Sequence, residues 1–472
     1  MQLIWLRNDL RITDNTALTA ACQRGPTLAL WIASPEQWLE HDEAPCKVDF
    51  WLRNLRDLRK SLEALNIPLL VRTTRTWQDV PQAVLELCQK HQVEAVHWND
   101  DYGVNETRRD QATREALEAA EIGVNSYLDQ LLFSPGSILT RSGGYFQVFS
   151  QFKKVCMERL HVGVPGLAGK VAAQTPLKIS SDAIPRHIEG FETPPETLRK
   201  LWPAGEEEAQ TRLQRFVDEA IDDYQVARDL PARPGTSQLS AYLAAGVVSP
   251  RQCLHAALSS NRGEFDSGSV GAQTWIGELI WREFYKHILV GYPQVSMHRA
   301  FRAHTEKLPW RNAPKDLQAW QEGRTGFPLI DAAMRQLLAT GWMHNRLRMV
   351  VAMFLSKNLL IDWREGERFF MRHLIDGDLA ANNGGWQWSA STGTDSVPYF
   401  RIFNPVTQST RFDPEGRFIA HWLPELEQLD KKSIHMPVKS ANEFATTNYV
   451  KPIVSLDSSR KRALEAFKSL PG

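Results

Sequence analysis

The strongest constraint in this sequence is a regular alternation of strand-like and helix-like segments over its first 130 residues. Short apolar runs of strand length recur, and between them apolar residues repeat every three to four positions, as Val48, Trp51, Leu55 and Leu58 do. Because consecutive strand–helix–strand units form right-handed parallel crossovers, the alternation predicts a parallel sheet covered by helices on both faces. The predicted strands are residues 2–6, 27–32, 68–72, 95–99 and 124–128.

Two further regions follow this α/β part. Residues 129–200 are rich in Pro and Gly, which predicts a connector between domains with one helix over 145–160. From residue 201 onward helical periodicity dominates. The predicted fold is therefore a doubly wound, Rossmann-like α/β domain over 1–128 joined to an all-helical domain over 201–472. The predicted helices of the second domain are 212–224, 239–245, 250–258, 275–289, 327–339, 343–357 and 364–374.

Composition excludes several classes of protein. The chain is 43% hydrophobic and 23% charged, with a mean hydropathy of −0.36, which excludes a disordered or membrane-spanning chain. Arg7, Asp9 and Arg11 occupy the place where a secretory signal needs an apolar segment, so we expect a cytoplasmic protein. The five cysteines are widely spaced and contain no C-x-x-C pair. This pattern predicts buried thiols rather than disulfides, and no metal site is expected.

Common motifs of enzymes are missing. The sequence lacks the G-x-G-x-x-G fingerprint and the phosphate loop, which argues against an NAD-dependent dehydrogenase and a P-loop enzyme. It also lacks the G-x-S-x-G and H-E-x-x-H motifs of serine hydrolases and zinc proteases.

Tryptophan and positive charge are concentrated in one part of the chain. Eight of the sixteen Trp residues fall between residues 275 and 388. The chain has no net charge, yet residues 275–372 contain about 15 Lys and Arg against about 9 Asp and Glu. A single Trp is most simply a core residue, but a basic segment with many aromatics is compatible with a nucleic-acid backbone as partner.

Several dense stretches carry residues suited to chemistry. Hydroxyls of Thr236, Ser237 and Ser240 stand at a predicted helix start, where a phosphate can be held. The run 376–391 has neither helical nor strand periodicity, which predicts backbone shaped around a ligand rather than a packed element. The stretches are GTSQLSAYLAAG (235–246), TWIGELIWREFY (274–285), GWMHNRLRM (341–349), DWREGERFF (362–370) and DGDLAANNGGWQWSAS (376–391).

Together with IWLRNDLR at 4–11 and YFQVFSQF at 145–152, these stretches resemble the photolyase and cryptochrome family over essentially the whole chain. The pattern is most similar to bacterial class I photolyases of cyclobutane pyrimidine dimers. The resemblance implies an N-terminal domain with an antenna chromophore and a helical domain that holds FAD, active as FADH−, beside a cavity in a basic surface.

The resemblance also implies which residues contact FAD. Asn382 corresponds to a position near flavin N5, where an amide can donate or accept a hydrogen bond; plant-type cryptochromes generally carry Asp there. The implied FAD residues are Tyr224, Thr236, Ser237, Gln238, Leu239, Ser240, Trp275, Arg282, Asp376, Gly377, Asp378 and Asn382.

A second implied set binds damaged DNA. Trp281 and Trp388 would stack on a flipped-out dimer, while Glu278 would satisfy polar groups of its bases. Relatives that repair six-four photoproducts carry His at the positions of Asn345 and Met349, so this chain favours the cyclobutane lesion. The implied substrate residues are Arg228, Glu278, Trp281, Asn345, Arg346, Arg348, Met349 and Trp388.

Electron transfer and light collection complete the implied machinery. Trp386, Trp363 and Trp310 match the family's electron relay and join Glu278 and Asn382 as catalytic residues. Asn105 and Glu106 match residues that bind a reduced folate antenna, methenyltetrahydrofolate. Where such relatives can present Lys, however, this chain has Ser296 and Met297, so a deazaflavin antenna stays open.

The expected activity is that of a deoxyribodipyrimidine photo-lyase, a carbon–carbon lyase. It would act as a monomer on ultraviolet-damaged DNA, in light, without an obligate protein partner. Two alternatives are a blue-light receptor of cryptochrome type and a DASH-type photolyase acting on single strands. Trp281, Trp388 and Asn382, and the lack of a long tail, favour repair over signalling.

Overall fold

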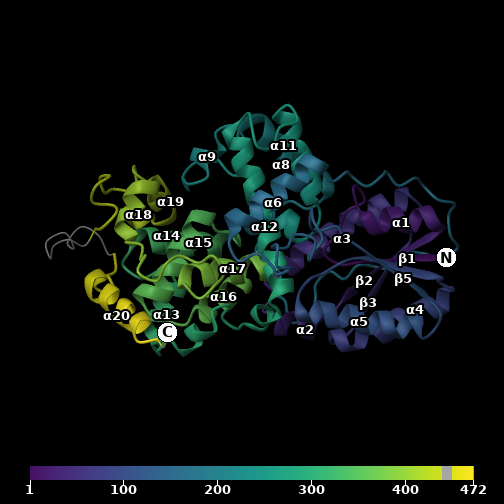
Figure 1. Ribbon diagram of the computed structural model, residues 1–472, viewed down its shortest axis with the longest axis horizontal. Coiled ribbons are helices and arrows are strands. Elements are labelled where there is room, and N and C mark those ends of the chain that lie inside the picture. Colours follow the sequence, from purple (N-terminus) through teal and green to yellow (C-terminus); the bar gives the residue numbers. More distant parts are fainter. Residues whose placement is uncertain (438–448, 471–472) are drawn as a thin grey trace. The chain divides into compact units, whose positions relative to one another are not determined.

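The computed structural model describes residues 1–437 and 449–470. The chain separates into two compact units that exchange segments along the sequence, which Figure 1 colours from purple to yellow. Unit 1 is built from Met1–Asp222, Ser237–Pro293 and Ile375–Asp378, and unit 2 from Asp223–Thr236, Gln294–Leu374 and Leu379–Gly472.

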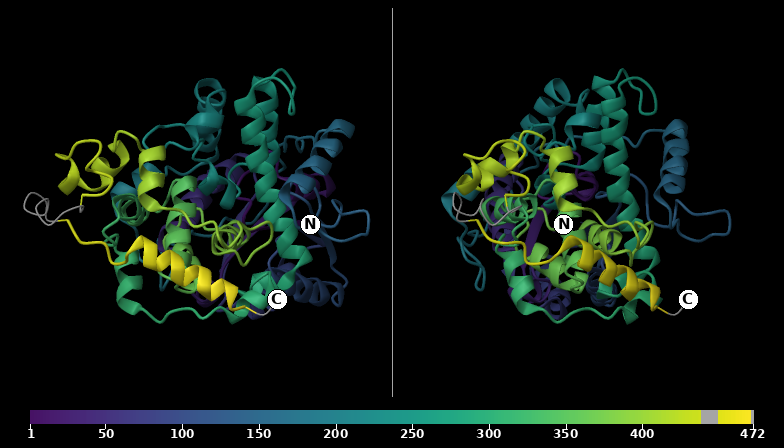
Figure 2. Two further views of the ribbon diagram at one scale, coloured as in Figure 1. Left: turned by 60° about the vertical axis from the view of Figure 1, so that its left-hand side comes forward. Right: turned by 90° about the vertical axis from the view of Figure 1, so that its left-hand side faces the viewer.

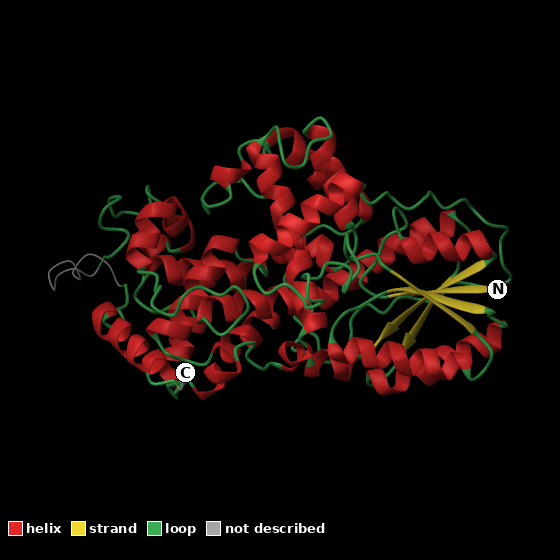
Figure 3. Cartoon of the chain, viewed as in Figure 1, coloured by secondary structure: helices red, strands yellow, loops and turns green. Residues whose placement is uncertain are grey.

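Unit 1 contains a five-stranded parallel sheet in the order β3-β2-β1-β4-β5, drawn in yellow in Figure 3. Gln2 of β1 lies opposite Thr27 of β2 and Ala95 of β4, so the strand order reverses at β1. The sequence predicted every strand to within one residue. The strands are β1 (Gln2–Leu6), β2 (Thr27–Ala33), β3 (Leu69–Thr73), β4 (Ala95–Asn99) and β5 (Gly123–Tyr127).

Helices cover both faces of this sheet, as predicted. Figure 1 shows α1 and α3 on one face and α4 and α5 on the other. Trp5 and Trp98 meet edge to face in the apolar layer beneath α4. The elements are α1 (Thr16–Arg24), α2 (Pro35–Glu40), α3 (Pro45–Ala64), η1 (Trp77–Asp79), α4 (Val80–His91) and α5 (Val104–Glu118).

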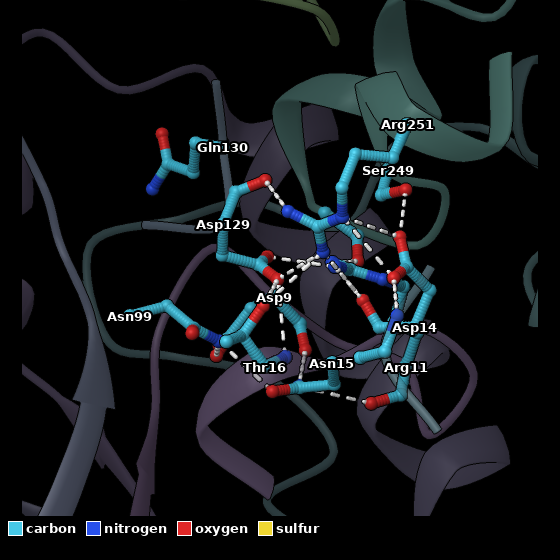
Figure 4. A network of polar contacts seen from close by, with 12 residues as sticks. Asp9, Arg11, Asp14, Asn15, Thr16, Asn99, Asp129, Gln130, Ser249 and Arg251 are labelled. Carbon is cyan, nitrogen blue, oxygen red and sulfur yellow. Dashed lines mark hydrogen bonds and ion pairs between the residues drawn. The ribbon is translucent and has the colours of Figure 1, made fainter. Parts of the chain in front are cut away.

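The loops that follow β1 and β4 emerge at the carboxyl edge, where parallel sheets place ligands. A buried network of charges holds the first of these loops, as Figure 4 shows. Arg251 binds Asp14 and Asp129 at 3.0 and 2.8 Å, and Arg11 binds Asp129 at 2.7 Å. Although burial opposes it, these two guanidinium groups lower the pKa of Asp129, which therefore stays ionised.

The remaining part of unit 1 is helical. Helix α12 is the longest helix, and its N-cap Ser269 accepts a hydrogen bond from the amide of Ala272. At Gly271 a Cβ would collide with the carbonyl oxygens of Ile221 and Asp222, so only glycine permits this approach. The elements are α6 (Phe149–Val162), α7 (Glu196–Leu201), α8 (Glu206–Glu219), α10 (Ser240–Ala244), α11 (Pro250–Ser260) and α12 (Val270–Gly291).

The described residues of unit 2 form helices joined by loops, with no strand, as the sequence predicted. Its core gathers Trp320, Trp363 and Trp386 among aliphatic side chains. Helix α20, yellow in Figure 2, packs on the π-helical turn η4. The elements are α9 (Tyr224–Ala227), η2 (Pro293–Met297), η3 (Ala303–Lys307), α13 (Pro314–Gln321), α14 (Pro328–Thr340), α15 (Asn345–Met353), η4 (Phe354–Asn358), α16 (Trp363–Met371), α17 (Leu379–Ala390), α18 (Pro405–Phe412), α19 (Arg417–Trp422), η5 (Pro424–Leu426) and α20 (Leu456–Lys468).

Several sequence predictions are wrong. The helix predicted over 212–224 runs over 206–219 instead, as α8, and α7 begins inside the connector 129–200, for which only one helix was predicted. The run 376–391 was expected to be irregular, but most of it forms helix α17. The buried side of α17 includes Asn383 and Gln387, which bond to each other at 2.8 Å, so a search for apolar periodicity misses the helix. The cysteines are free, but Cys22 is only partly buried because it lies in the last turn of α1.

No helix in the described ranges 1–437 and 449–470 is both long and apolar enough to cross a membrane.

Candidate functional site

In unit 1, helix α12 presents Glu278, Trp281 and Arg282 on one face, as their spacing predicts. The Trp281 indole stacks on the ring of Phe149 with centroids 3.6 Å apart and planes at 9°. One face of this half-buried indole is therefore covered, and the ring is held in a fixed plane. Arg282 is also fixed, because its guanidinium donates to the carbonyl oxygen of Gln130. Nearer the start of the helix, Trp275 is buried against Phe216.

The predicted phosphate-binding residues come just before helix α10. Ser240 is the first residue of α10, so the predicted helix start is confirmed. Gln238 has a φ of 50°, in the left-handed region, and Leu239 is buried. Ser237 to Ser240 belong to unit 1, whereas Thr236 and the buried Tyr224 belong to unit 2.

The short segment Ile375–Asp378 also belongs to unit 1. Asp376 is buried, and Asp378 forms an ion pair with Lys286 of α12 at 2.6 Å. The carbonyl oxygen of Gly377 accepts a hydrogen bond from Nζ of Lys47 at 2.6 Å. Both lysines were absent from the predicted site, although Lys286 lies four residues after Arg282 on the same helix.

Asn105 and Glu106 lie in the first turn of α5, at the carboxyl edge of the sheet. Gly103 allows Glu106 to fold back, because a Cβ at residue 103 would overlap the Glu106 carboxylate. Burial raises the pKa of Glu106. Nδ2 of Asn105 lies 3.0 Å from Nε2 of His41, and Nε2 of Gln37 lies 3.1 Å from the same atom. Since both amide nitrogens can only donate, Nε2 of His41 accepts, and burial lowers the pKa of this neutral ring.

Aromatic rings and one cation complete this edge. The rings of His41 and Trp77 meet edge to face at 4.7 Å. The Arg109 guanidinium lies 4.6 Å from the centroid of Trp77. The edge thus combines flat rings with hydrogen-bond acceptors. Ser296 and Met297 lie in η2 of unit 2.

In unit 2, the predicted DNA-binding residues gather around the start of α15. Asn345 is exposed, and Met349 is half-buried one turn farther on. Arg346 is already occupied: its guanidinium binds Asp229 at 2.7 Å and lies 4.6 Å from the centroid of Phe412. Asp229 was not predicted from the sequence, since nothing local connects it to α15.

Two further predicted arginines also have neighbours in unit 2. Arg348 donates from Nε to the carbonyl oxygen of Met343 at 2.8 Å. Arg228 lies with its guanidinium 5.7 Å from the ring centroid of Tyr224. Both side chains are half-buried.

On α17, the amide of Asn382 is oriented by the backbone of α16. Nδ2 of Asn382 donates to the carbonyl oxygen of Glu367 at 3.0 Å. The neighbouring Asn383 donates to the Glu367 carboxylate at 2.8 Å, so both amides are anchored at one residue. The amide oxygen of Asn382 thereby remains the group that can accept from a ligand.

The predicted relay residues differ in burial. Trp363 and Trp386 are buried in the core of unit 2, whereas Trp310 is half-buried. Among the described residues, Nε1 of Trp363 and of Trp386 has no hydrogen-bond partner. The equally buried Trp320 does have one, since its Nε1 donates to the carbonyl oxygen of Val351 at 3.1 Å.

Close packing fixes the Trp386 indole. Its centroid lies 5.0 Å from Phe370 and 5.9 Å from Trp320, with both rings roughly perpendicular to it. A Cβ at Gly366 of α16 would overlap the indole, so glycine admits it against the helix. Trp388, two residues on, is half-buried.

Sequence comparison finds family matches in the N-terminal and in the C-terminal part of the chain. Residues 2–171 match the family described as DNA photolyase, and residues 275–469 match the FAD binding domain of DNA photolyase. The deoxyribodipyrimidine photo-lyase of Escherichia coli strain K12 is 43% identical over 471 residues, which are 99% of this chain and 98% of that protein. The chain therefore belongs to the DNA photolyase family.

Solved structures agree with this membership. A bacterial class III photolyase from Agrobacterium tumefaciens shows a TM-score of 0.89 at 33% identity, covering 99% of this chain and 97% of that one. An archaeal photolyase from Sulfolobus tokodaii, solved with two FAD molecules, shows a TM-score of 0.83 at 30% identity and covers 100% of both chains. In that archaeal protein the two FAD molecules imply a novel light-harvesting cofactor.

Proposed function

We propose that this chain is a light-driven DNA photolyase that splits cyclobutane pyrimidine dimers. The observation that carries the proposal is the face of α12, where a fixed, half-buried indole shares a helix turn with a carboxylate and an anchored guanidinium. Such a face is suited to stack a base and satisfy its polar groups. It occurs in a chain that matches photolyases over its whole length.

The donor and acceptor groups present fit FAD. Asn382 keeps its amide oxygen for a ligand, and a reduced flavin offers an N–H at N5. We propose that hydroxyls and backbone amides at Thr236, Ser237 and Ser240 hold the phosphates, and that Asp376 and Asp378 accept from ribose and flavin. When bound and reduced, FAD supplies an electron on excitation by light and takes it back after the cyclobutane ring opens. The remaining proposed contacts are Tyr224, Gln238, Leu239, Trp275, Arg282 and Gly377.

Damaged DNA would be bound by two kinds of contact. We propose that Trp281 and Trp388 stack on the dimer, while Glu278, Asn345 and Met349 line the bases. Arg228, Arg346 and Arg348 would position the flanking phosphates without reading sequence. Because Asp229 already neutralises part of the Arg346 charge, we assign Arg346 less than one full phosphate contact. Replacing Arg346 by Ala should therefore lower the slope of log affinity against log salt by less than about one.

We further propose that Trp386, Trp363 and Trp310 carry electrons to an oxidised flavin. In that role the indoles act before repair, by restoring the reduced state, and not in the repair step itself. Trp310→Phe should then slow photoreduction and leave repair by pre-reduced protein unchanged. Equal loss of both activities would contradict the relay.

For the antenna, we propose a reduced folate bound at Asn105 and Glu106. The Asn105 amide oxygen and the Glu106 carboxylate are neighbouring acceptors, because His41 already occupies the Asn105 nitrogen. The pterin ring of a folate offers neighbouring N–H donors, which a deazaflavin does not. Extraction of the bound chromophore, followed by absorption and mass spectra, separates a folate from a deazaflavin or a second flavin.

We propose that the protein acts as a monomer on DNA and, since its substrate is chromosomal, in the cytoplasm. The direct test is to illuminate the reduced protein with ultraviolet-damaged duplex and single-stranded DNA. Loss of dimers from duplex DNA supports the proposal. Loss only from single strands would favour a DASH-type enzyme, and retention in both would favour a receptor.

Binding provides a second test. Trp281→Ala should weaken the binding of damaged DNA by about 1–3 kcal/mol through lost stacking. Trp422→Ala, which removes another half-buried indole outside the proposed DNA and FAD contacts, is a matched control. Unchanged affinity in Trp281→Ala would contradict the assigned role.

A further inference from the structure

The segment Ile375–Asp378 stands out in the chain because its neighbours on both sides belong to unit 2, whereas the segment itself belongs to unit 1. A four-residue segment cannot be held by packing of its own. Its side chains and carbonyls must therefore be bound by elements of unit 1, and the structure identifies two lysines that do so.

The first is Lys47, in the opening turn of α3. Nζ of Lys47 donates to the Gly377 carbonyl oxygen at 2.6 Å and to the Glu43 carboxylate at 2.6 Å. It also lies 4.9 Å from the centroid of Trp51. The side chain is only 7% exposed, and lysines are almost never so buried unless paired. Glu43 balances the charge, so the bond to Gly377 fixes the position of the backbone.

The second is Lys286, one turn after Arg282 on α12. It pairs with the Asp378 carboxylate at 2.6 Å, with both side chains largely buried. Burial raises the pKa of the thiol of Cys46, the neighbour of Lys47, to about 12, and the charge of Asp376 adds to this rise. The segment is thus held by α3 at Gly377 and by α12 at Asp378.

We propose that Lys47 is a positioning residue for FAD binding, which acts by holding the Gly377 carbonyl so that the carboxylates of Asp376 and Asp378 face the cofactor. This inference rests on the proposed function, which assigns those carboxylates to FAD. Lys47 itself does not touch the cofactor. Lys286 pairs with the Asp378 carboxylate, and Lys47 sets where the backbone between the two carboxylates lies.

The test replaces Lys47 with Met, which keeps the chain length and the packing on Trp51 but removes the donor. The matched control is Lys60→Met on the same helix, where the lysine is 78% exposed and only loosely paired with Asp57. We expect full-length holoprotein of Lys47→Met to release FAD about tenfold faster on dilution, the equivalent of one hydrogen bond from a charged donor. The visible circular dichroism of the flavin that stays bound should also change, and Lys47→Arg should restore part of both effects.

The outcomes separate this inference from the function on which it rests. Wild-type protein that binds no FAD would refute the proposed function. Wild-type protein that binds FAD, with Lys47→Met and Lys60→Met releasing it equally, would refute the role of Lys47. Faster release with an unchanged flavin spectrum and a matching fall in the unfolding midpoint would show mere destabilisation and would also overturn it.

Discussion

Unit 1 and unit 2 each contain a distinctive buried cluster, here called its centre, and the two centres differ in kind. In unit 1 the centre is ionic: Arg11, Asp14, Asp129 and Arg251 form the network drawn in Figure 4. In unit 2 it is aromatic, with Trp320, Trp363 and Trp386 in one apolar cluster. The ionic centre joins residues more than 100 positions apart, whereas the aromatic one comes from a single stretch of about 70 residues.

This difference indicates which substitutions should destabilise each unit. A buried charge that loses its partner is left uncompensated in a medium of low dielectric constant. Removal of any one charged side chain of the network should therefore destabilise unit 1 strongly. An aromatic core tolerates the exchange of one ring for another at a smaller cost. Unit 2 can therefore carry indoles chosen for their chemistry, whereas the residues of the unit 1 network are committed to holding the loop after β1.

The largest effect should come from breaking the ionic centre. Arg251→Met leaves Asp14 without its cation and Asp129 with Arg11 alone, and we expect the free energy of unfolding to fall by about 3–5 kcal/mol. Denaturant unfolding followed by circular dichroism measures it. Arg215→Met, at an exposed position on α8, is the control and should change stability by less than about 0.5 kcal/mol. A similarly small loss of unfolding free energy in both variants would contradict the proposed sensitivity of the ionic centre.

Within the aromatic centre we expect smaller effects, and two variants should rank in opposite order for stability and for photoreduction. Trp320→Phe removes the hydrogen bond to Val351, whereas Trp363→Phe removes none, so Trp320→Phe should be less stable by about 1 kcal/mol. Photoreduction of oxidised flavin should show the reverse order, with strong loss only in Trp363→Phe. Thermal unfolding and flavin absorption under illumination measure the two properties. If stability and photoreduction fall together in both variants, the indoles of unit 2 have no distinct chemical role.

The last effect appears only as a change of stability with pH, and it concerns the one described lysine that is fully buried in unit 2. Lys357 donates to the carbonyl oxygen of Arg401 at 2.9 Å, and burial lowers the pKa of its amine from 10.5 to about 7. Because the unfolded chain binds the proton more tightly, stability from this group is full above pH 10.5 and is lost as the pH falls toward 7.

Lys357→Met should therefore flatten the dependence of unfolding free energy on pH between about 7 and 10.5. Urea unfolding at several pH values measures the slope, with Lys468→Met in α20 as a control that leaves it unchanged. An identical slope in wild type and Lys357→Met would contradict a buried, neutral amine.

Sequence patterns predicted the parts of the fold that depend on local periodicity. The strands were placed to within one residue because most of them contain a short apolar run bounded by polar residues, as β1 and β2 do. Helix α17 was missed because Asn383 and Gln387 occupy its buried side. Buried polar residues that form hydrogen bonds with one another cannot be recognised as buried from a hydropathy pattern.

The candidate site shows the same limit. Glu278, Trp281 and Arg282 could be placed on one face from spacing alone. The contacts of Arg346 with Asp229, and of Lys47 with Gly377, join residues more than 100 positions apart and depend on tertiary structure. The stacking of Phe149 on Trp281 lay within a recognised stretch, YFQVFSQF, yet its geometry could not be read from that stretch.

The most direct measurement follows the dimer and the flavin in one sample. Pre-reduced protein is mixed with DNA containing cyclobutane dimers, and intact pyrimidines and flavin absorption are recorded in light and in the dark. We predict that light restores the pyrimidines over many turnovers while the flavin ends as reduced as it began, and that nothing changes in the dark. Dimers that persist in light, or flavin oxidised once for each dimer lost, would contradict the account.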